Sequence, residues 1–280
     1  MIELTKSGLP LRWDETGKKL DFGPGMKEIE PALRNLGEMK DVLYSEAALD
    51  RDPALPLYYM YRDVHLAEHR SFFREAGIRY DITVLVPGML EREYVKTAGH
   101  YHPFKEGTGC TYPEVYEVLQ GEAHYLLQKP RNFDDPAAGL DEVLVVAAGP
   151  GDKVLIPPGF GHITINPGSG FLVMSNLVAD NFDSIYGPIK EMGGAGYYEV
   201  APAGKEQGPV FIPNVRYPSL PPLCFTEPVE LPNFFLIKEI PQYRSFVEHR
   251  EDFDFLTSPE YYEEEFSSYL QDLKSGFLQI

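Results

Sequence analysis

The sequence predicts a mainly β protein in which short strands form a closed antiparallel barrel or a jelly roll. Short segments rich in β-branched or aromatic residues follow one another from Tyr80 onward, separated by glycine, proline or aspartate. Glycine and proline number 25 each, which suits many tight turns, and 18 tyrosines and 17 phenylalanines favour pleated, half-buried surfaces. The expected strands lie near residues 80–87, 93–102, 114–120, 122–129, 142–148, 153–157, 161–166 and 170–178.

The N-terminal lead-in, residues 1–79, has a mixed pattern, whereas the barrel segment, residues 80–217, is dominated by short strand patterns. Within it, Lys27–Leu36 and Ala48–Asp52 predict short helices or turns, and Tyr61–Ala76 has the spacing of a helix. We expect this lead-in to pack on the barrel and to add strands against it.

The C-terminal extension, residues 218–280, predicts a terminal helix. Ser258 and a following proline resemble a helix start, acidic residues fill the next turn, and Gly276 marks the end. Between the barrel strands and this extension, residues 183–217 form a return segment rich in glycine and proline. The expected organisation is therefore one barrel with an extension on each side.

The net charge of −18 narrows the possible partners. Such an acidic chain repels nucleic acid and anionic membrane surfaces, so we expect neither as a partner. A phosphorylated substrate is repelled at long range as well. A phosphate site must then be built locally from backbone N–H groups, hydroxyls or a metal.

Several features favour a cytoplasmic protein. The first fifteen residues are charged early and do not resemble a signal peptide. The longest apolar run, residues 143–148, is far too short to span a membrane. Cys110 and Cys224 are the only cysteines, which excludes a disulfide framework.

Two segments carry the residues suited to chemistry, Gly99–Gly121 and Gly151–Asn166. Because alternate residues of a strand face the same side, His100 and His102 can both point inward while Tyr101 points outward. Glu114 and Tyr116 share one face of the next strand, and His162 lies in a third. Three imidazoles and a carboxylate suit Fe(II), Mn(II), Ni(II) or Zn(II) and leave room for water or substrate oxygens.

These two segments resemble the paired motifs of the cupin superfamily. The second has a glycine, five residues and then P-x-G-x-x-H-x-x-x-N, and the first contains the H-x-H pair. The resemblance implies a cupin jelly-roll β-barrel and the metal ligands His100, His102, Glu114 and His162. Glu106 and Glu117 are alternatives for the carboxylate, but the six residues between Glu114 and Gly121 favour Glu114.

A narrower resemblance, from roughly residue 10 to residue 217, is to the archaeal cupin-type glucose-6-phosphate isomerase family. It rests on T-x-G-H-x-H, P-E-V-Y and L-L-Q at Thr97–His102, Pro113–Tyr116 and Leu126–Gln128, and on TVLVPG at residues 83–88. The last sixty or so residues lie outside the resemblance.

The resemblance implies a metal-dependent aldose–ketose isomerase of glycolysis and gluconeogenesis. It would interconvert glucose 6-phosphate and fructose 6-phosphate as a homodimer with one divalent metal per chain, Fe2+ before Mn2+, Ni2+ or Zn2+. Glu114 would be the catalytic carboxylate and Tyr116 an assisting hydroxyl. Whether a proton is shuttled through Glu114 or a hydride moves between the two carbons stays open.

The resemblance also implies where the phosphate binds. Thr83, Thr97 and Gly99 match the family's phosphate ligands, with Tyr58 or Tyr61 nearby. Hydroxyls and a backbone N–H can hold a phosphate without adding a cation.

Other functions remain as alternatives. A cupin dioxygenase uses a similar ligand set, and a mannose-6-phosphate or uronate isomerase uses similar chemistry. A non-catalytic sugar-binding cupin would not need the full ligand set. The string H-L-A-E-H at residues 65–69 matches a zinc-protease motif, but the match is short, and we favour a plain amphipathic helix with solvated charges.

Overall fold

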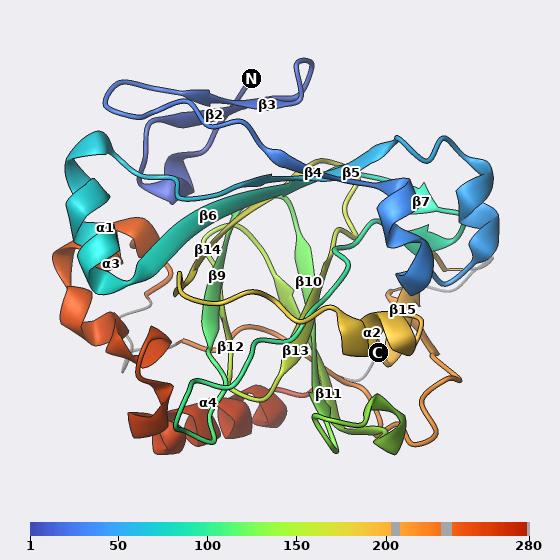
Figure 1. Ribbon diagram of the computed structural model, residues 1–280. Helices are drawn as coiled ribbons and strands as arrows, with labels where there is room; N and C mark the ends of the chain where they lie inside the picture. Colours follow the sequence, from blue (N-terminus) through green and yellow to red (C-terminus); the bar gives the residue numbers. More distant parts are fainter. Residues whose placement is uncertain (203–207, 231–236, 279–280) are drawn as a thin grey trace.

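Two β-sheets facing each other across the core form the centre of the molecule (Figure 1). This computed structural model describes residues 1–202, 208–230 and 237–278. The larger sheet has the order β12 (Lys153–Ile156), β9 (Glu114–Gln120), β14 (Leu172–Ala179), β6 (Ile78–Leu85), β5 (Pro56–Tyr61) and β4 (Ala32–Asn35). The smaller has the order β13 (Gly161–Ile165), β10 (Ala123–Pro130), β11 (Leu140–Ala148) and β17 (Cys224–Thr226).

The predicted mainly β, cupin-like fold is confirmed, but a closed barrel is not. Among the described residues, the hydrogen-bonded ladders of the two sheets stay separate. Of the expected strand 93–102, only the first two residues form a regular strand, β8 (Glu93–Tyr94). Lys96 and His100 then make isolated bridges to Ile165 and His162 of β13. The seven other expected segments correspond to β6 and β9–β14.

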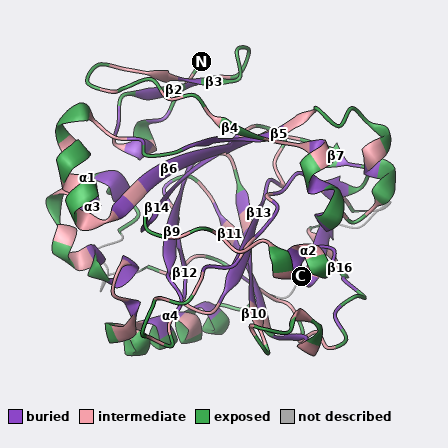
Figure 2. Cartoon of the chain, in the orientation of Figure 1, coloured by how far each residue is buried: buried purple, intermediate pink, exposed green. Residues whose placement is uncertain are grey.

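Both faces of the larger sheet are covered, as the purple strands of Figure 2 show. Every residue of β14 is buried, and β6 is buried except at Arg79. The outer face is covered by the N-terminal hairpin, where the Trp13 ring lies 5.7 Å from Tyr59 and 5.3 Å from Phe171. The inner face forms the pocket described below. The three-stranded hairpin sheet comprises β1 (Ile2–Glu3), β2 (Leu11–Asp14) and β3 (Lys19–Phe22).

The helical predictions for the lead-in are only partly correct. Residues 32–35, expected in a helix or turn, form strand β4 because they pair with β5 at the sheet edge. The helix expected over Tyr61–Ala76 is reduced to α1 (Arg70–Ala76), since Tyr61 belongs to β5. Residues 46–50 form the expected short helical turn. The lead-in contains the 3-10 helices η1 (Thr5–Ser7), η2 (Leu36–Val42), η3 (Glu46–Asp50) and η4 (Ala67–His69), and η5 (Pro136–Ala138) follows between β10 and β11.

A second small sheet lies at the right of Figure 1. Its order is β16 (Val210–Pro213), β15 (Tyr197–Val200), β8 and β7 (Met89–Leu90), and α2 (Gly187–Glu191) lies between β14 and β15 in the chain. The return segment therefore contains two strands and a short helix rather than turns alone.

The C-terminal extension returns to the barrel and contains the expected terminal helix. The helix α4 (Glu263–Ser275) has three glutamates in its first turn and is followed by Gly276, as predicted. The Ser258–Pro259 signal instead starts the 3-10 helix η8 (Pro259–Tyr261). The Tyr269 hydroxyl of α4 accepts a hydrogen bond from the Leu155 N–H of edge strand β12. The extension also contains α3 (Gln242–Glu248) and η7 (Arg250–Leu256).

A buried ion pair joins the extension to the larger sheet. Lys153 Nζ lies 3.2 Å from Glu117 Oε1 and 2.8 Å from the Ile237 carbonyl oxygen. Glu117 Oε2 accepts the Gln242 N–H at 2.7 Å, and burial raises the pKa of Glu117 to about 7. A buried carboxylate that is paired and hydrogen-bonded in this way is committed to the packing of the extension.

No helix in the described part of the chain is long and apolar enough to cross a membrane.

Candidate metal centre and substrate pocket

Three histidines and one glutamate meet on the inner side of the larger sheet. One nitrogen from each of His100, His102 and His162 and one oxygen from Glu114 all lie within 4.8 Å of one another. The two sheets and the segment between β8 and β9 supply them, so residues far apart in sequence converge. Alternation along the chain explains the pairing of His100 with His102, as the sequence predicted.

The Nε2 atoms of the three histidines and Oε2 of Glu114 point toward a common centre. Nε2 of His100 faces Nε2 of His102 at 3.2 Å, and Glu114 Oε2 lies 3.1 Å from His162 Nε2 and 3.4 Å from His102 Nε2. Burial, with the neighbouring histidines, holds the pKa of His100 well below its usual value. Burial alone would raise the pKa of Glu114, but the close contacts of its carboxylate with His102 and His162 outweigh burial and hold that pKa well below its usual range.

This group fits a divalent metal. His102 Nδ1 lies 2.8 Å from the Tyr112 carbonyl oxygen, which can only accept, so Nδ1 carries the proton and the Nε2 lone pair faces the group. Glu114 Oε2 is buried with no other hydrogen-bond donor in the described structure. Neutral imidazoles and an ionised carboxylate are the donor set that Fe(II), Mn(II), Ni(II) and Zn(II) share.

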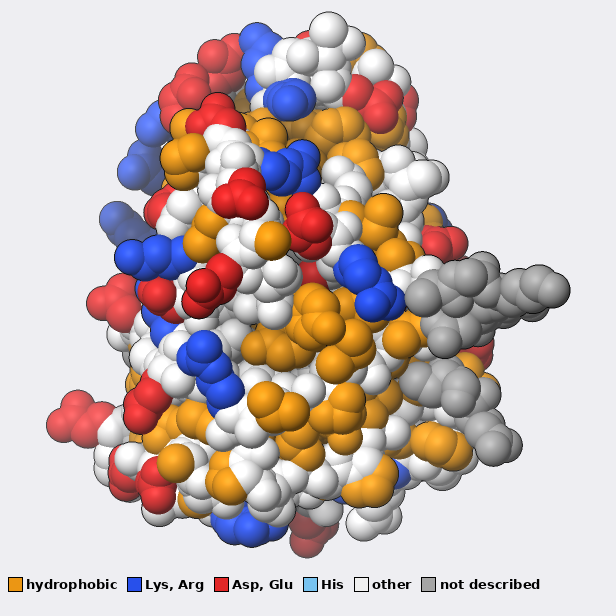
Figure 3. All heavy atoms as spheres, turned by 90° about the vertical axis from the view of Figure 1, so that its right-hand side faces the viewer, with side chains coloured by type: hydrophobic (Ala, Val, Ile, Leu, Met, Phe, Trp, Pro, Cys, Tyr) orange, Lys and Arg blue, Asp and Glu red, His pale blue; other side chains and the backbone are white. Residues whose placement is uncertain are grey.

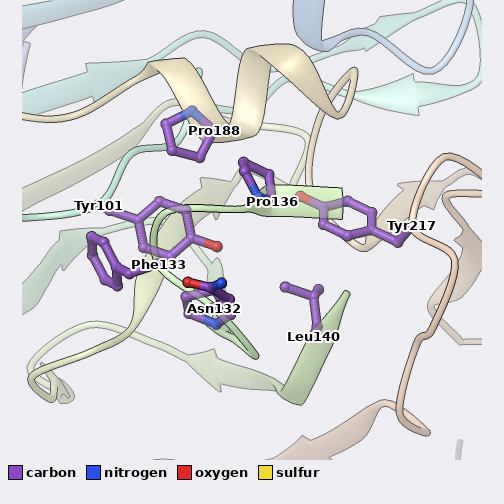
Figure 4. Close-up of a pocket in the computed structure, with 8 residues that line it drawn as sticks. Tyr101, Asn132, Phe133, Pro136, Leu140, Pro188 and Tyr217 are labelled. Atoms are coloured by element: carbon purple, nitrogen blue, oxygen red, sulfur yellow. The ribbon is translucent and has the colours of Figure 1, made fainter. Parts of the chain in front are cut away.

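Tyr101, between the first two histidines, points to the other side of its segment, as predicted. Figure 4 shows its ring at a cleft with Phe133 and Tyr217. Gln128 Nε2 donates to the Tyr101 hydroxyl at 2.6 Å and to the Tyr217 hydroxyl at 3.2 Å. The Tyr101 backbone also exchanges two hydrogen bonds with Ile185. These contacts hold the histidine-bearing segment in place and give Gln128 of the L-L-Q string a structural role.

Neither alternative carboxylate joins the histidines. Glu117 points away from the pocket and pairs with Lys153, and Glu106 lies exposed in the loop before β9. Two residues after Glu114, the Tyr116 hydroxyl lies 3.2 Å from His162 Nε2. Burial, followed by the charge of Glu114, raises the pKa of Tyr116 well above its usual value. Tyr116 is therefore a protonated phenol beside the candidate metal centre.

The expected phosphate residues lie in the same pocket, with one exception. Thr83, Thr97, Gly99 and Tyr58 line it together with the four candidate ligands. At Gly99, φ is +75°, and an added Cβ would lie 2.4 Å from Ile163, so the position requires glycine.

Tyr61 is the exception, because it does not line the pocket. It occupies the opposite face of β5 from Tyr58, because the two are an odd number of residues apart. Its hydroxyl accepts the Leu20 N–H at 3.0 Å, and its ring contacts Phe22 of the N-terminal hairpin. We therefore withdraw Tyr61 from the candidate phosphate site.

The pocket also contains cationic and amide side chains that the sequence analysis missed. Arg62, Arg79 and Asn176 line it, and Arg34 lies over the ring of pocket residue Tyr186 at 5.5 Å. The alternation of side chains along a strand could have identified the two arginines. Arg79 is four residues from Thr83 and Arg62 is four residues from Tyr58, so each pair shares a face. A charged residue at an inward strand position indicates a polar pocket rather than a packed core.

The zinc-protease string does not form a metal site in the described structure. His65 Nδ1 contacts the Leu66 carbonyl oxygen, and His69 Nδ1 lies 2.7 Å from the Tyr243 hydroxyl of α3. Both rings pack on aromatic neighbours at the junction of lead-in and extension. Their role is structural.

A jelly roll whose pocket combines this ligand group with hydroxyl and cationic side chains defines a cupin with a candidate metal centre. The family described as Glucose-6-phosphate isomerase (GPI) matches residues 34–209. The chain belongs to the glucose-6-phosphate isomerase family, as the sequence predicted. The match begins later than the expected residue 10 and ends before β17, so the terminal helices lie outside it.

Relatives from archaea agree with this membership. The glucose-6-phosphate isomerase of Thermococcus litoralis is 31% identical over 180 residues, which cover 63% of this chain and 85% of the relative. That of Pyrococcus abyssi is 29% identical over 183 residues with the same coverage. Among solved structures, Bacillus subtilis oxalate decarboxylase matches with 17% identity and a TM-score of 0.32 over 49% of this chain and 30% of that one. An oxalate oxidase matches with 16% identity and a TM-score of 0.34 over 47% and 56%.

Proposed function

We propose that this chain interconverts glucose 6-phosphate and fructose 6-phosphate with one divalent metal held by His100, His102, Glu114 and His162. Family membership supports the reaction. The observation that carries the proposal is the meeting of these four side chains in one pocket with the hydroxyl-bearing residues Thr83 and Thr97. Fe2+ is our first choice of metal, and the donor set also suits Mn2+, Ni2+ and Zn2+.

The chemistry requires an opened sugar ring and transfer of hydrogen between C2 and C1. A bound divalent ion would polarise the oxygens on C1 and C2. In the proton route, Glu114 would accept the C2 proton, which leaves an enediolate; a proton would move from the C2 hydroxyl to the C1 oxygen, and Glu114 would return its proton to C1. The low pKa of Glu114 keeps it ionised, as a metal ligand must be, and the protonated Tyr116 can donate to a substrate oxygen.

The phosphate is proposed to bind at the other end of the pocket. Thr83, Thr97, Tyr58 and the Gly99 N–H can supply donors there without adding a full charge. Thr97 also has a structural task, since its Oγ1 accepts the Thr164 N–H at 2.9 Å. Thr83 pairs with both neighbouring strands through its backbone, but its side chain has no comparable hydrogen bond among the described residues, so it is the cleaner residue to test.

A coupled assay of the purified protein tests the proposed reaction. Glucose, mannose and fructose 6-phosphates are supplied in turn, with oxygen uptake followed in parallel. We expect interconversion of the glucose and fructose esters and no oxygen consumption. Turnover of the mannose ester alone would indicate a different isomerase, and oxygen uptake without isomerisation would indicate a dioxygenase.

Replacement of Thr83 by valine should weaken phosphate binding without changing metal content. Loss of one hydrogen bond to a charged group costs about 1.5–3 kcal/mol, or roughly ten- to a hundredfold in Kd. Calorimetric titration with inorganic phosphate and a phosphorylated inhibitor measures this loss. Thr16→Val, on an exposed turn, is the matched control. Unchanged affinity of Thr83→Val for both ligands would remove Thr83 from the site.

A homodimer and a cytoplasmic location belong to the same proposal. The face at the right of Figure 1 carries a broad area of hydrophobic side chains in Figure 3, which supports an interface between two copies. Exposed apolar residues on segments of that side include Tyr44, Met89 and Val215. Cys110 and Cys224 are both free, in agreement with a reducing compartment.

A further inference from the structure

Two arginines at the pocket wall are held by one buried carboxylate. Asp81 is fully buried and accepts from Arg62 Nη1 at 2.6 Å and from Arg79 Nε at 2.8 and 2.9 Å. A guanidinium has five N–H donors in a fixed fork, so each arginine keeps donors beyond those used on Asp81. The side chain of Arg62 is 45% exposed and that of Arg79 is 28% exposed, so both reach open space while their partner is enclosed.

The backbone turns directly after Arg62, at Asp63. Asp63 has φ of +58°, a left-handed conformation that is uncommon outside glycine. Its N–H donates to Asp81 Oδ1 at 2.9 Å. The same carboxylate therefore fixes the guanidinium of Arg62 and the turn that follows it.

A buried amide donor that has no protein partner among the described residues, Asn176 Nδ2, faces the same space. Asn176 is 2% exposed and lines the pocket, and its Nδ2 has no hydrogen-bond partner in the described structure. An unpaired buried donor costs free energy, and a ligand oxygen would remove that cost. The Asn176 amide therefore points to a bound group with an acceptor.

The strand register places these groups between the two ends of the pocket. Asp81 lies opposite Asn176, which lies opposite Tyr116. The neighbouring row on one side contains Thr83 and the row on the other contains Glu114. Rows on one face are two residues apart, about 6.5 Å along the strands. A sugar phosphate that extends from Thr83 to Glu114 passes over the Asp81–Asn176 row.

We propose that Arg62 and Asn176 donate hydrogen bonds to hydroxyl groups in the middle of the sugar chain, with Asp81 as the residue that positions Arg62. This inference rests on the proposed function for the direction of the substrate. The hydroxyls on C3 and C4 are the partners, because C1 and C2 face the metal centre and C5 adjoins the carbon whose phosphate faces Thr83. The two donors thereby select a sugar with oxygens at these positions.

Arg62→Met and Asn176→Leu test the assignment by removing the donors while keeping side-chain size. We expect kcat/KM for glucose 6-phosphate and affinity for glucitol 6-phosphate, an open-chain analogue, to fall roughly ten- to a hundredfold in each variant. Affinity for inorganic phosphate and metal content should stay unchanged. Arg244→Met, which removes an exposed guanidinium paired with Glu248, controls for net charge and should behave as the parent.

Deoxy substrates identify the partner hydroxyls. The loss caused by Arg62→Met or Asn176→Leu should shrink toward onefold with 3-deoxy- or 4-deoxyglucose 6-phosphate, because the hydrogen bond is already absent. A full loss on both deoxy compounds, weakened phosphate binding, or unchanged kinetics would overturn the proposal. Should Arg62→Met unfold, Asn176→Leu decides, since Asn176 donates to no protein group.

Failure of the proposed reaction gives a different result. A metal-loaded parent that binds glucitol 6-phosphate but isomerises no sugar phosphate would refute the isomerase assignment alone. The calorimetric comparison of the parent with the two variants would still decide whether Arg62 and Asn176 contact the sugar chain.

Discussion

Replacement of Glu114 by glutamine is expected to lower kcat by roughly a hundredfold or more, the usual scale for loss of a general base. Glutamine keeps the shape and one oxygen donor but removes the charge and the basicity. Because the three histidines remain, we expect the variant to keep much of its metal. Steady-state kinetics and metal analysis on the same preparation measure both quantities.

Glu106→Gln is the matched control, since Glu106 is exposed in the loop before β9 and lies outside the ligand group. Its activity should equal that of the parent. A Glu114→Gln variant whose activity follows metal occupancy and returns with excess metal would limit Glu114 to coordination.

Deuterium at C2 of the substrate checks the same role independently. A proton held by Glu114 exchanges with solvent, so the label should partly wash out. Near-complete retention at C1, together with an active Glu114→Gln variant, would assign the transfer to a hydride shift and leave the metal centre unchanged.

Removal of the metal is expected to abolish activity, and addition of one equivalent of Fe2+ under reducing conditions should restore it. We expect this because three imidazoles and a carboxylate meet in one group. In addition, the buried Glu114 Oε2 has no hydrogen-bond partner in the described structure. Elemental analysis of freshly purified protein should find about one divalent ion per chain. Comparison of Fe2+, Mn2+, Ni2+ and Zn2+ in reconstitution identifies the preferred metal.

Two histidine variants separate the centre from other sites. His102→Ala should lose the metal because it removes a candidate ligand. The Tyr112 carbonyl oxygen holds the proton of His102 on Nδ1 and so leaves Nε2 free for the metal. His65→Ala should keep it, since His65 packs on Phe73 away from the group. Full activity in a demonstrably metal-free sample would refute a metal-dependent reaction.

The sequence by itself determined the family and the members of the ligand group. Strand alternation put His100 and His102 on one face and Tyr101 on the other, and local spacing selected Glu114. These inferences need only the strand period and short-range motifs. The terminal helix was predictable for the same reason, because its acidic first turn and final glycine are local signals.

Only the tertiary structure decided which residues share the pocket. The choice between Tyr58 and Tyr61 depends on which face of β5 meets the second sheet, and short motifs do not carry that information. Strand β4 was missed because its pairing with β5, rather than local propensity, makes it a strand. Residues 95–102 make isolated bridges to β13 and Ile185 instead of the expected regular strand, because strand formation there also depends on long-range pairing. Arg62, Asp81 and Asn176 come together through cross-strand register, a long-range property that three separate segments acquire only when they fold.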